Sequence, residues 1–251
     1  MREIFTRLQS EASYSKDCLE KIDEINIEVN LEALESKEMN PWLLSVFIKS
    51  DTMEANEESY EEFLETKEAL IIALEHNQRA VYVGSRLVDG WSEFYFYSYD
   101  SKRIDVIVKN ILVPSEYIYE SNIVRDTKWD FYELQLEPTE LELCHIQSAK
   151  IIFLLAEEGE DLTIPRDVEH YVSFETPTGK NRFVNTLDLE GFSFKDEIST
   201  EDFEHGVALV KNHNVTEKEV QKVVNTLFEK VKIDNGYYEG WSTLLINKDE
   251  E

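Results

Sequence analysis

The chain has 251 residues, with 53 acidic and 25 basic side chains and a formal net charge of −28. Such a field repels phosphate backbones and attracts basic protein segments, so it disfavours nucleic acid as a partner. The hydrophobic content of 42% argues against global disorder, and no stretch approaches the roughly 20 apolar residues of a membrane span.

Residues 1–40 predict little regular structure beyond an alternating strand at 25–29 and a short Glu-rich helix at 31–39. A clearer β-α-β-β-α-β order follows, with a hairpin turn at Asp89-Gly90 and with Lys67 on the apolar face of the first helix. The strands are predicted at 42–48, 80–87, 94–99 and 129–136, and the helices near 59–74 and 104–111.

Residues 139–158 predict a further helix, because Thr139 and Glu142 have capping-box spacing and Gly159 suits the helix end. The acidic stretch 160–165 is typical of a linker. A second β-α-β-β-α-β order then begins, with helices starting at Thr176-Pro177 and Thr216, the second of which has an apolar stripe from Val220 to Val231. Its strands are predicted at 171–175, from about 192–195 onward, at 206–211 and from 236.

Two successive copies of this order predict an α+β protein of two ferredoxin-like β-α-β-β-α-β sandwiches with antiparallel sheets. The expected domains are 1–158, with a core at about 40–138 plus the helix 139–158, and 165–251. In each domain two helices would cover one sheet face and leave the other face uncovered.

The C-terminal half contains HYVSF at 170–174, EGF at 190–192 and YEGWST at 238–243. With these motifs, about residues 165–247 resemble the regulator of ribonuclease activity B family. The resemblance implies the ferredoxin-like fold and a protein inhibitor that binds the endoribonuclease ribonuclease E and adjusts RNA-degradation complexes. The founding members are single small domains with long acidic tails, whereas this chain has a further domain before the matching region.

Roughly residues 40–138 are similar to domain of unknown function number 695. The matching residues are Arg86, Asp89-Gly90, Phe94 to Tyr97, and Asp126, Trp129 and Tyr132 at spacings of three. This resemblance implies no known activity.

The sequence contains no recognisable catalytic or metal-binding motif. Cys18 and Cys144 lie far apart, none of the five histidines has metal-ligand spacing, and no phosphate-binding loop or nucleophile motif occurs. The sequence therefore predicts a non-enzymatic protein with no catalytic residue, no metal and no cofactor. A small ligand or an unrecognised activity of the N-terminal domain remains an alternative.

A second alternative is RNA binding, because RNA-recognition domains share this strand order and stack bases on third-strand aromatic residues such as those at 94–97. Asp89 and Glu93 stand where basic and small residues would be expected, and the net charge opposes RNA. RNA binding is therefore the weaker interpretation.

The uncovered sheet faces would carry enough Tyr and Trp to form an interface. By the period of two, Tyr237, Glu239 and Trp241 share the helix-free face of the last strand. Trp241 then either anchors a partner or packs against the other domain. The candidate partner-binding residues are Tyr237, Glu239, Trp241, His170, Trp91, Tyr95, Tyr97, Arg86 and Trp129.

The sequence thus predicts a regulator that binds a protein with a basic segment, with a ribonuclease as one candidate, and that binds neither nucleic acid nor membrane. Residues 1–5 have no basic flank leading into an apolar run, so we expect no signal peptide and a cytoplasmic location. The oligomeric state is not predicted.

Overall fold

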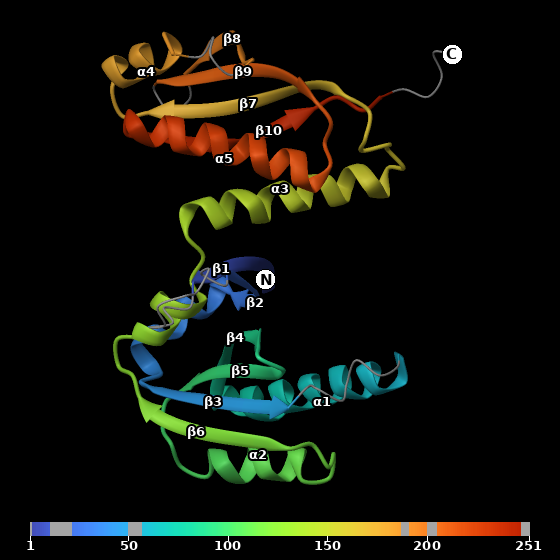
Figure 1. Ribbon diagram of the computed structural model, residues 1–251. Coiled ribbons are helices and arrows are strands. Elements are labelled where there is room, and N and C mark those ends of the chain that lie inside the picture. Colours follow the sequence, from blue (N-terminus) through green and yellow to red (C-terminus); the bar gives the residue numbers. More distant parts are fainter. Residues whose placement is uncertain (1, 11–21, 50–56, 187–190, 200–204, 247–251) are drawn as a thin grey trace, which may run out of the picture. The chain divides into compact units, whose positions relative to one another are not determined.

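The structure is a computed structural model that describes residues 2–10, 22–49, 57–186, 191–199 and 205–246 (Figure 1). It divides into two compact units, Met1–Glu137 and Pro138–Glu251, which we call unit 1 and unit 2. No helix within the described ranges is long and apolar enough to cross a membrane. Cys18 lies outside these ranges.

Unit 1 is built on a six-stranded antiparallel sheet with the strand order β1-β2-β4-β5-β3-β6. The strands are β1 (Arg2–Ser10), β2 (Ile22–Asn30), β3 (Trp42–Lys49), β4 (Ala80–Val88), β5 (Trp91–Ser98) and β6 (Tyr119–Arg125). The helices are α1 (Glu57–Glu75), α2 (Ile104–Leu112), the 3₁₀ helices η1 (Leu31–Met39) and η3 (His76–Gln78), and the π-helical turn η4 (Tyr132–Leu136).

Helices α1 and α2 cover one face of this sheet. Side chains alternate across a strand, so β3 directs Leu44, Val46 and Ile48 to the same face. They join one buried cluster with residues of both helices, among them Leu70 of α1 and Val108 of α2. Within the described ranges, this cluster includes residues of β3, β4 and β5 and no residue of β1 or β2.

Residues 129–136 do not form the predicted strand; the last strand of unit 1 is β6. The carboxylate of Asp126 accepts hydrogen bonds from the backbone N–H groups of Asp130 and Phe131. This capping, together with a left-handed φ of 62° at Trp129, turns the chain into η4. Unit 1 also has six strands rather than four, because β1 and β2 extend the sheet beside β4.

Unit 2 contains a four-stranded antiparallel sheet with the order β10-β7-β9-β8. The strands are β7 (Arg166–Phe174), β8 (Ser193–Ile198), β9 (Gly206–His213) and β10 (Gly236–Thr243). The helices are α3 (Glu140–Glu157), α4 (Pro177–Val184) and α5 (Glu217–Ile233). All three helices contribute to one buried cluster with the sheet, so the predicted α+β class with antiparallel sheets is confirmed for both units.

Helix α3 packs in unit 2, although the sequence analysis assigned residues 139–158 to the N-terminal domain. The predicted capping box at Thr139 is present. The buried face of α3, including Cys144 and Leu155, belongs to the core of unit 2. The expected boundary at 158–165 is therefore corrected to 137/138, because this apolar face is covered by α5 and β10.

The stretch 160–165 is likewise no free linker. The guanidinium of Arg166 pairs with Glu160 at 2.5 Å, and both side chains are almost completely buried. Arg166 also donates to the backbone oxygen of Asp161, and the N–H of Val215 donates to that of Leu162. These contacts fasten the stretch to the sheet of unit 2.

Candidate functional site

Strand β10 contains a β-bulge that changes which side chains face the helices. Tyr238 pairs with Val172 and Gly240 with Tyr171, so Glu239 between them has no residue opposite it on strand β7. Gly240 adopts a φ of 125°, which L side chains rarely adopt. The extra residue shifts the period of two, and consequently both Tyr238 and Trp241 face the core.

Trp241 is part of the core of unit 2, with only 4% of its surface exposed. Its indole Nε1 donates a hydrogen bond to the Ser148 hydroxyl of α3 at 3.0 Å. The placement of Trp241 on the helix-free face is therefore wrong. Its neighbours Tyr237, which is 43% exposed, and Glu239 are accessible as expected.

His170 lies in a buried hydrogen-bonded chain and not on a surface. His213 Nδ1 is 2.7 Å from the Asn214 carbonyl oxygen, which only accepts, so this nitrogen carries the proton. His213 Nε2 then accepts from His170 Nε2–H at 3.1 Å, and His170 Nδ1 accepts from the Tyr238 hydroxyl at 2.9 Å. With these donors and acceptors, all three hydrogen bonds form with both imidazoles neutral.

The environment of the two histidines favours these neutral forms. Burial, reinforced by the neighbouring His213 and Lys211, lowers the pKa of His170 to about 3. Burial also lowers the pKa of His213. His170 therefore supports the fold and is not accessible to a partner.

A surface groove of about 260 Å³, here called the β10 groove, lies between α3, α5 and β10. Its apolar part is formed by Leu143 and Phe228, and its polar rim includes the exposed residues Tyr237 and Glu239. The full lining is Glu140, Leu143, Cys144, Gln147, Phe228, Lys232, Tyr237, Tyr238 and Glu239.

Lys232 is the one basic side chain that lines the β10 groove. It forms an ion pair with Glu140, and its ammonium lies 4.6 Å from the centre of the Tyr237 ring and 5.3 Å from that of Phe228. The Tyr237 hydroxyl donates to Glu175 at 3.0 Å. The arrangement presents carboxylates and aromatic faces, which are the groups that bind a cationic side chain.

The Cys144 thiol of the β10 groove is held in its protonated, weakly nucleophilic form. Burial, together with the charge of Glu140, raises the pKa of the Cys144 thiol to about 11, so the thiol stays protonated at neutral pH. Among the described residues, no group of three or more His, Cys, Asp or Glu side chains could hold a metal ion.

In unit 1 most of the predicted partner-binding aromatic residues are buried by the chain itself. The rings of Tyr97 and Trp129 stack at 4.0 Å, and the Trp129 Nε1 donates to the backbone oxygen of Asn40 at 2.8 Å. Tyr95 packs on Phe131 at 4.4 Å. This surface is therefore not available for base stacking or for a partner, and Trp91 is only half-buried.

Arg86 has a structural role in the same layer. It donates to Glu93 at 2.9 Å, to the Gln135 side chain at 2.8 Å and to the Tyr95 hydroxyl at 3.0 Å. Tyr97 donates in turn to Asp126 at 2.6 Å. The residues that carry the resemblance of unit 1 thus hold η4 and the turn before it against the sheet.

Sequence analysis missed the groove residues outside β10, namely Glu140, Leu143, Cys144, Gln147, Phe228 and Lys232. The capping box at Thr139 located α3, and the apolar stripe located α5. No sequence signal showed that α3 packs beside β10, which is the contact that creates the groove.

Comparison with curated proteins finds no match. Among solved structures, "Crystal Structure of an Unknown Protein from Galdieria sulphuraria" is 11% identical, covers 82% of this chain and 99% of that chain, and has a TM-score of 0.24. "Crystal structure of putative glycine cleavage system transcriptional repressor" is 11% identical, covers 81% and 98%, and has a TM-score of 0.21. At such TM-scores no conclusion follows from either.

Two protein families match separate parts of the chain. Residues 19–136 match the "Family of unknown function (DUF695)", which falls within unit 1. Residues 145–243 match "Regulator of ribonuclease activity B", which falls within unit 2 and includes most of α3. Both resemblances found in the sequence are confirmed: residues 19–136 match the family of unknown function DUF695, and residues 145–243 match the regulator of ribonuclease activity B family.

Proposed function

We propose that the chain is a non-enzymatic regulator that binds a ribonuclease, or another member of an RNA-degradation complex, through the β10 groove. The match of residues 145–243 supports the class of partner. The exposure of Tyr237 and Glu239 beside the buried pair Tyr238 and Trp241 is the observation that carries the location. Tyr238 and Trp241 hold the strand, and the exposed residues Tyr237 and Glu239 meet the partner.

The proposed partner presents a basic side chain to this groove. Lys232 already occupies the place of such a cation, between Glu140 and the Tyr237 ring. The Lys232–Glu140 pair is partly exposed, and exposed pairs contribute only about 0–1 kcal/mol. A partner Arg or Lys can therefore displace Lys232, and the chain's net charge of −28 favours its approach.

The finer architecture and the location belong to the same proposal. We assign a ferredoxin-like arrangement to each unit, supported by the orders β3-α1-β4-β5-α2-β6 and β7-α4-β8-β9-α5-β10. A cytoplasmic site of action is proposed with it. The pocket described in the next subsection supports a second candidate function, small-ligand binding by unit 1.

Affinity capture from a lysate of the source cell tests the function. The full chain is compared with a Tyr237→Ala/Glu239→Lys double variant, and each retained fraction is assayed for RNA cleavage with and without added chain. We expect the unmodified chain to retain a ribonuclease, or a subunit bound to one, and to change its cleavage rate. Retention of no such protein, or equal retention by both chains, would contradict the proposal.

Salt dependence tests the charge argument separately. If a basic segment enters the β10 groove, raising the salt concentration from about 50 to 500 mM weakens binding several-fold by screening. An affinity that does not depend on salt would contradict the charge argument and would indicate an apolar interface.

A further inference from the structure

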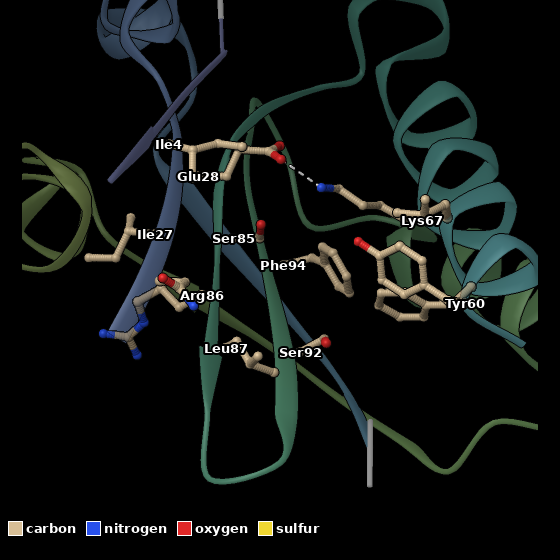
Figure 2. A pocket seen from close by; sticks show the side chains of 13 residues that line it. Ile4, Ile27, Glu28, Tyr60, Lys67, Ser85, Arg86, Leu87, Ser92 and Phe94 are labelled. Carbon is tan, nitrogen blue, oxygen red and sulfur yellow. Dashed lines mark hydrogen bonds and ion pairs between the residues drawn. The ribbon is translucent and has the colours of Figure 1, made fainter. Parts of the chain in front are cut away.

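Unit 1 contains a pocket on the helix-covered face of its sheet (Figure 2). Its floor is formed by β2, β4 and β5 and its wall by α1. The volume is about 230 Å³, which is smaller than the roughly 300–1,000 Å³ of pockets for drug-sized ligands. The pocket therefore suits one small metabolite.

An ion pair crosses the pocket. Lys67 reaches from α1 towards Glu28 on β2, and its Nζ lies 2.8 Å from Glu28 Oε2 (Figure 2). The Tyr82 hydroxyl donates to the other oxygen, Glu28 Oε1, at 2.9 Å. Both charged side chains are largely shielded from solvent, with 16% and 17% of their surfaces exposed.

Both members of this pair have unused hydrogen-bonding capacity. An ammonium has three donors, and among the described residues Glu28 is the one acceptor recorded for Lys67. A carboxylate accepts about four hydrogen bonds, and two are accounted for at Glu28. Arg86 does not compete, because its side chain points away from Lys67 and binds Glu93 and Gln135 (Figure 2).

The rest of the pocket is apolar and partly open. Phe63 and Phe94 are buried at its base, whereas Tyr60, Leu64 and Leu87 are exposed around it. Apolar side chains gathered at the mouth of a pocket with a few convergent polar groups are typical of a small-molecule site. A ligand for this pocket therefore combines an apolar body with charge at one end.

Glu28 and Lys67 determine which charged groups a ligand of this pocket can have. A ligand with an anionic group alone would meet Glu28, and one with a cationic group alone would meet Lys67. A zwitterion places its carboxylate beside Lys67 and its ammonium beside Glu28, so that four groups alternate in sign and every donor faces an acceptor. The net charge of the site does not change on binding.

The geometry points to a binding site in unit 1 for a small zwitterion with a large apolar side chain, that is, a free amino acid of the leucine or phenylalanine type. Its side chain lies against Phe94 and the apolar rim, and its charged groups join the Glu28–Lys67 pair. This site is separate from the β10 groove and does not depend on the proposed function of unit 2.

Calorimetric titration of the full chain with matched ligands tests the proposal. L-Leucine and L-phenylalanine are the probes; 4-methylpentanoate is leucine without its ammonium group, 3-methylbutylamine is leucine without its carboxylate, and glycine lacks the apolar side chain. We expect at least one of the two amino acids to bind, and the leucine analogues and glycine to bind at least about tenfold more weakly. Absence of binding by both amino acids at millimolar concentration, or equal binding of an analogue, would overturn it.

Variants locate the site. Lys67→Met and Glu28→Gln remove one charge each at nearly constant shape, and each is expected to weaken binding at least about tenfold. Lys109→Met, on the exposed surface of α2, is the matched control and leaves the affinity unchanged. Melting curves without ligand show that each variant is folded. Affinity unchanged in folded Lys67→Met would place the ligand elsewhere; should that variant not fold, the ligand series on the unmodified chain still decides.

Discussion

The strands β5 of unit 1 and β10 of unit 2 are both rich in aromatic residues, and the chain covers each of them differently. In β5 the alternation is regular, and the face with Tyr95 and Tyr97 is covered by the turn that contains Trp129. In β10 a bulge brings Tyr238 and Trp241 to the helical face. In both strands the buried aromatic side chains lie where other parts of the chain cover the sheet. The accessible side chains are their neighbours along the strand.

The two units also differ in how fully helices cover their sheets. Among the described residues, α1 and α2 leave a pocket beside β2 in unit 1, whereas α3, α4 and α5 all contribute to the core of unit 2. The accessible feature of unit 2 is consequently a groove at the edge of its sheet. The proposed site for a small molecule accordingly lies in unit 1, and the proposed surface for a protein partner lies in unit 2.

The largest effects are expected from truncating the buried tryptophans. Trp129→Ala in unit 1 and Trp241→Ala in unit 2 should each lower the free energy of unfolding by about 3–5 kcal/mol, because both create a cavity and leave a hydrogen-bond acceptor unpaired. Thermal and denaturant unfolding of the full chain measure this. A loss below about 1 kcal/mol at either position would break the comparison, since that ring would not be part of a core.

Acid should destabilise unit 2 through the buried histidines. The pKa of His170 is lowered to about 3 in the folded chain, so between pH 6.5 and 3 the unfolded chain binds a proton that the folded chain does not. The contribution of neutral His170 to the free energy of unfolding is complete above about pH 6.5. It is lost as the pH falls, and the free energy of unfolding is lower by about 2 kcal/mol at pH 5.

Two variants isolate this contribution to acid sensitivity. His170→Gln should flatten the dependence of unfolding free energy on pH below about 6.5. His76→Gln, an exposed position in unit 1, should leave the slope unchanged. Equal slopes in the unmodified chain and in His170→Gln would show that His170 does not remain neutral in the folded state.

A smaller effect is expected from removing the bulge glycine. Gly240→Ala forces an L side chain to a φ of 125° and should cost about 1–2 kcal/mol of stability. A Cβ there would meet no atom within 4 Å, so the cost is conformational and not steric. Unchanged stability, measured by denaturant unfolding, would mean that β10 can pair without the bulge and that Trp241 can change faces.

The sequence predicted most helices and strands because apolar periodicity and capping residues are local signals. Thr139, for example, predicted the start of α3, and the apolar stripe from Val220 to Val231 predicted α5. The bulge at Glu239 and the turn at Asp126 were not predicted, because each depends on pairing or capping that periodicity does not encode. The packing of α3 beside β10 depends on contacts between residues far apart in the sequence, which local patterns do not encode. Both the domain boundary and the groove depend on this packing.

The most direct test of the central claim compares partner affinity and stability in a single substitution, Tyr237→Ala. The claim is that the exposed residues Tyr237 and Glu239, and not Trp241, meet the partner. We expect the captured partner to bind this variant more weakly by about 2 kcal/mol, a factor of about 30, while the unfolding free energy changes by less than about 0.5 kcal/mol. Unchanged affinity in the folded Tyr237→Ala chain would contradict the claim that the β10 groove binds the partner.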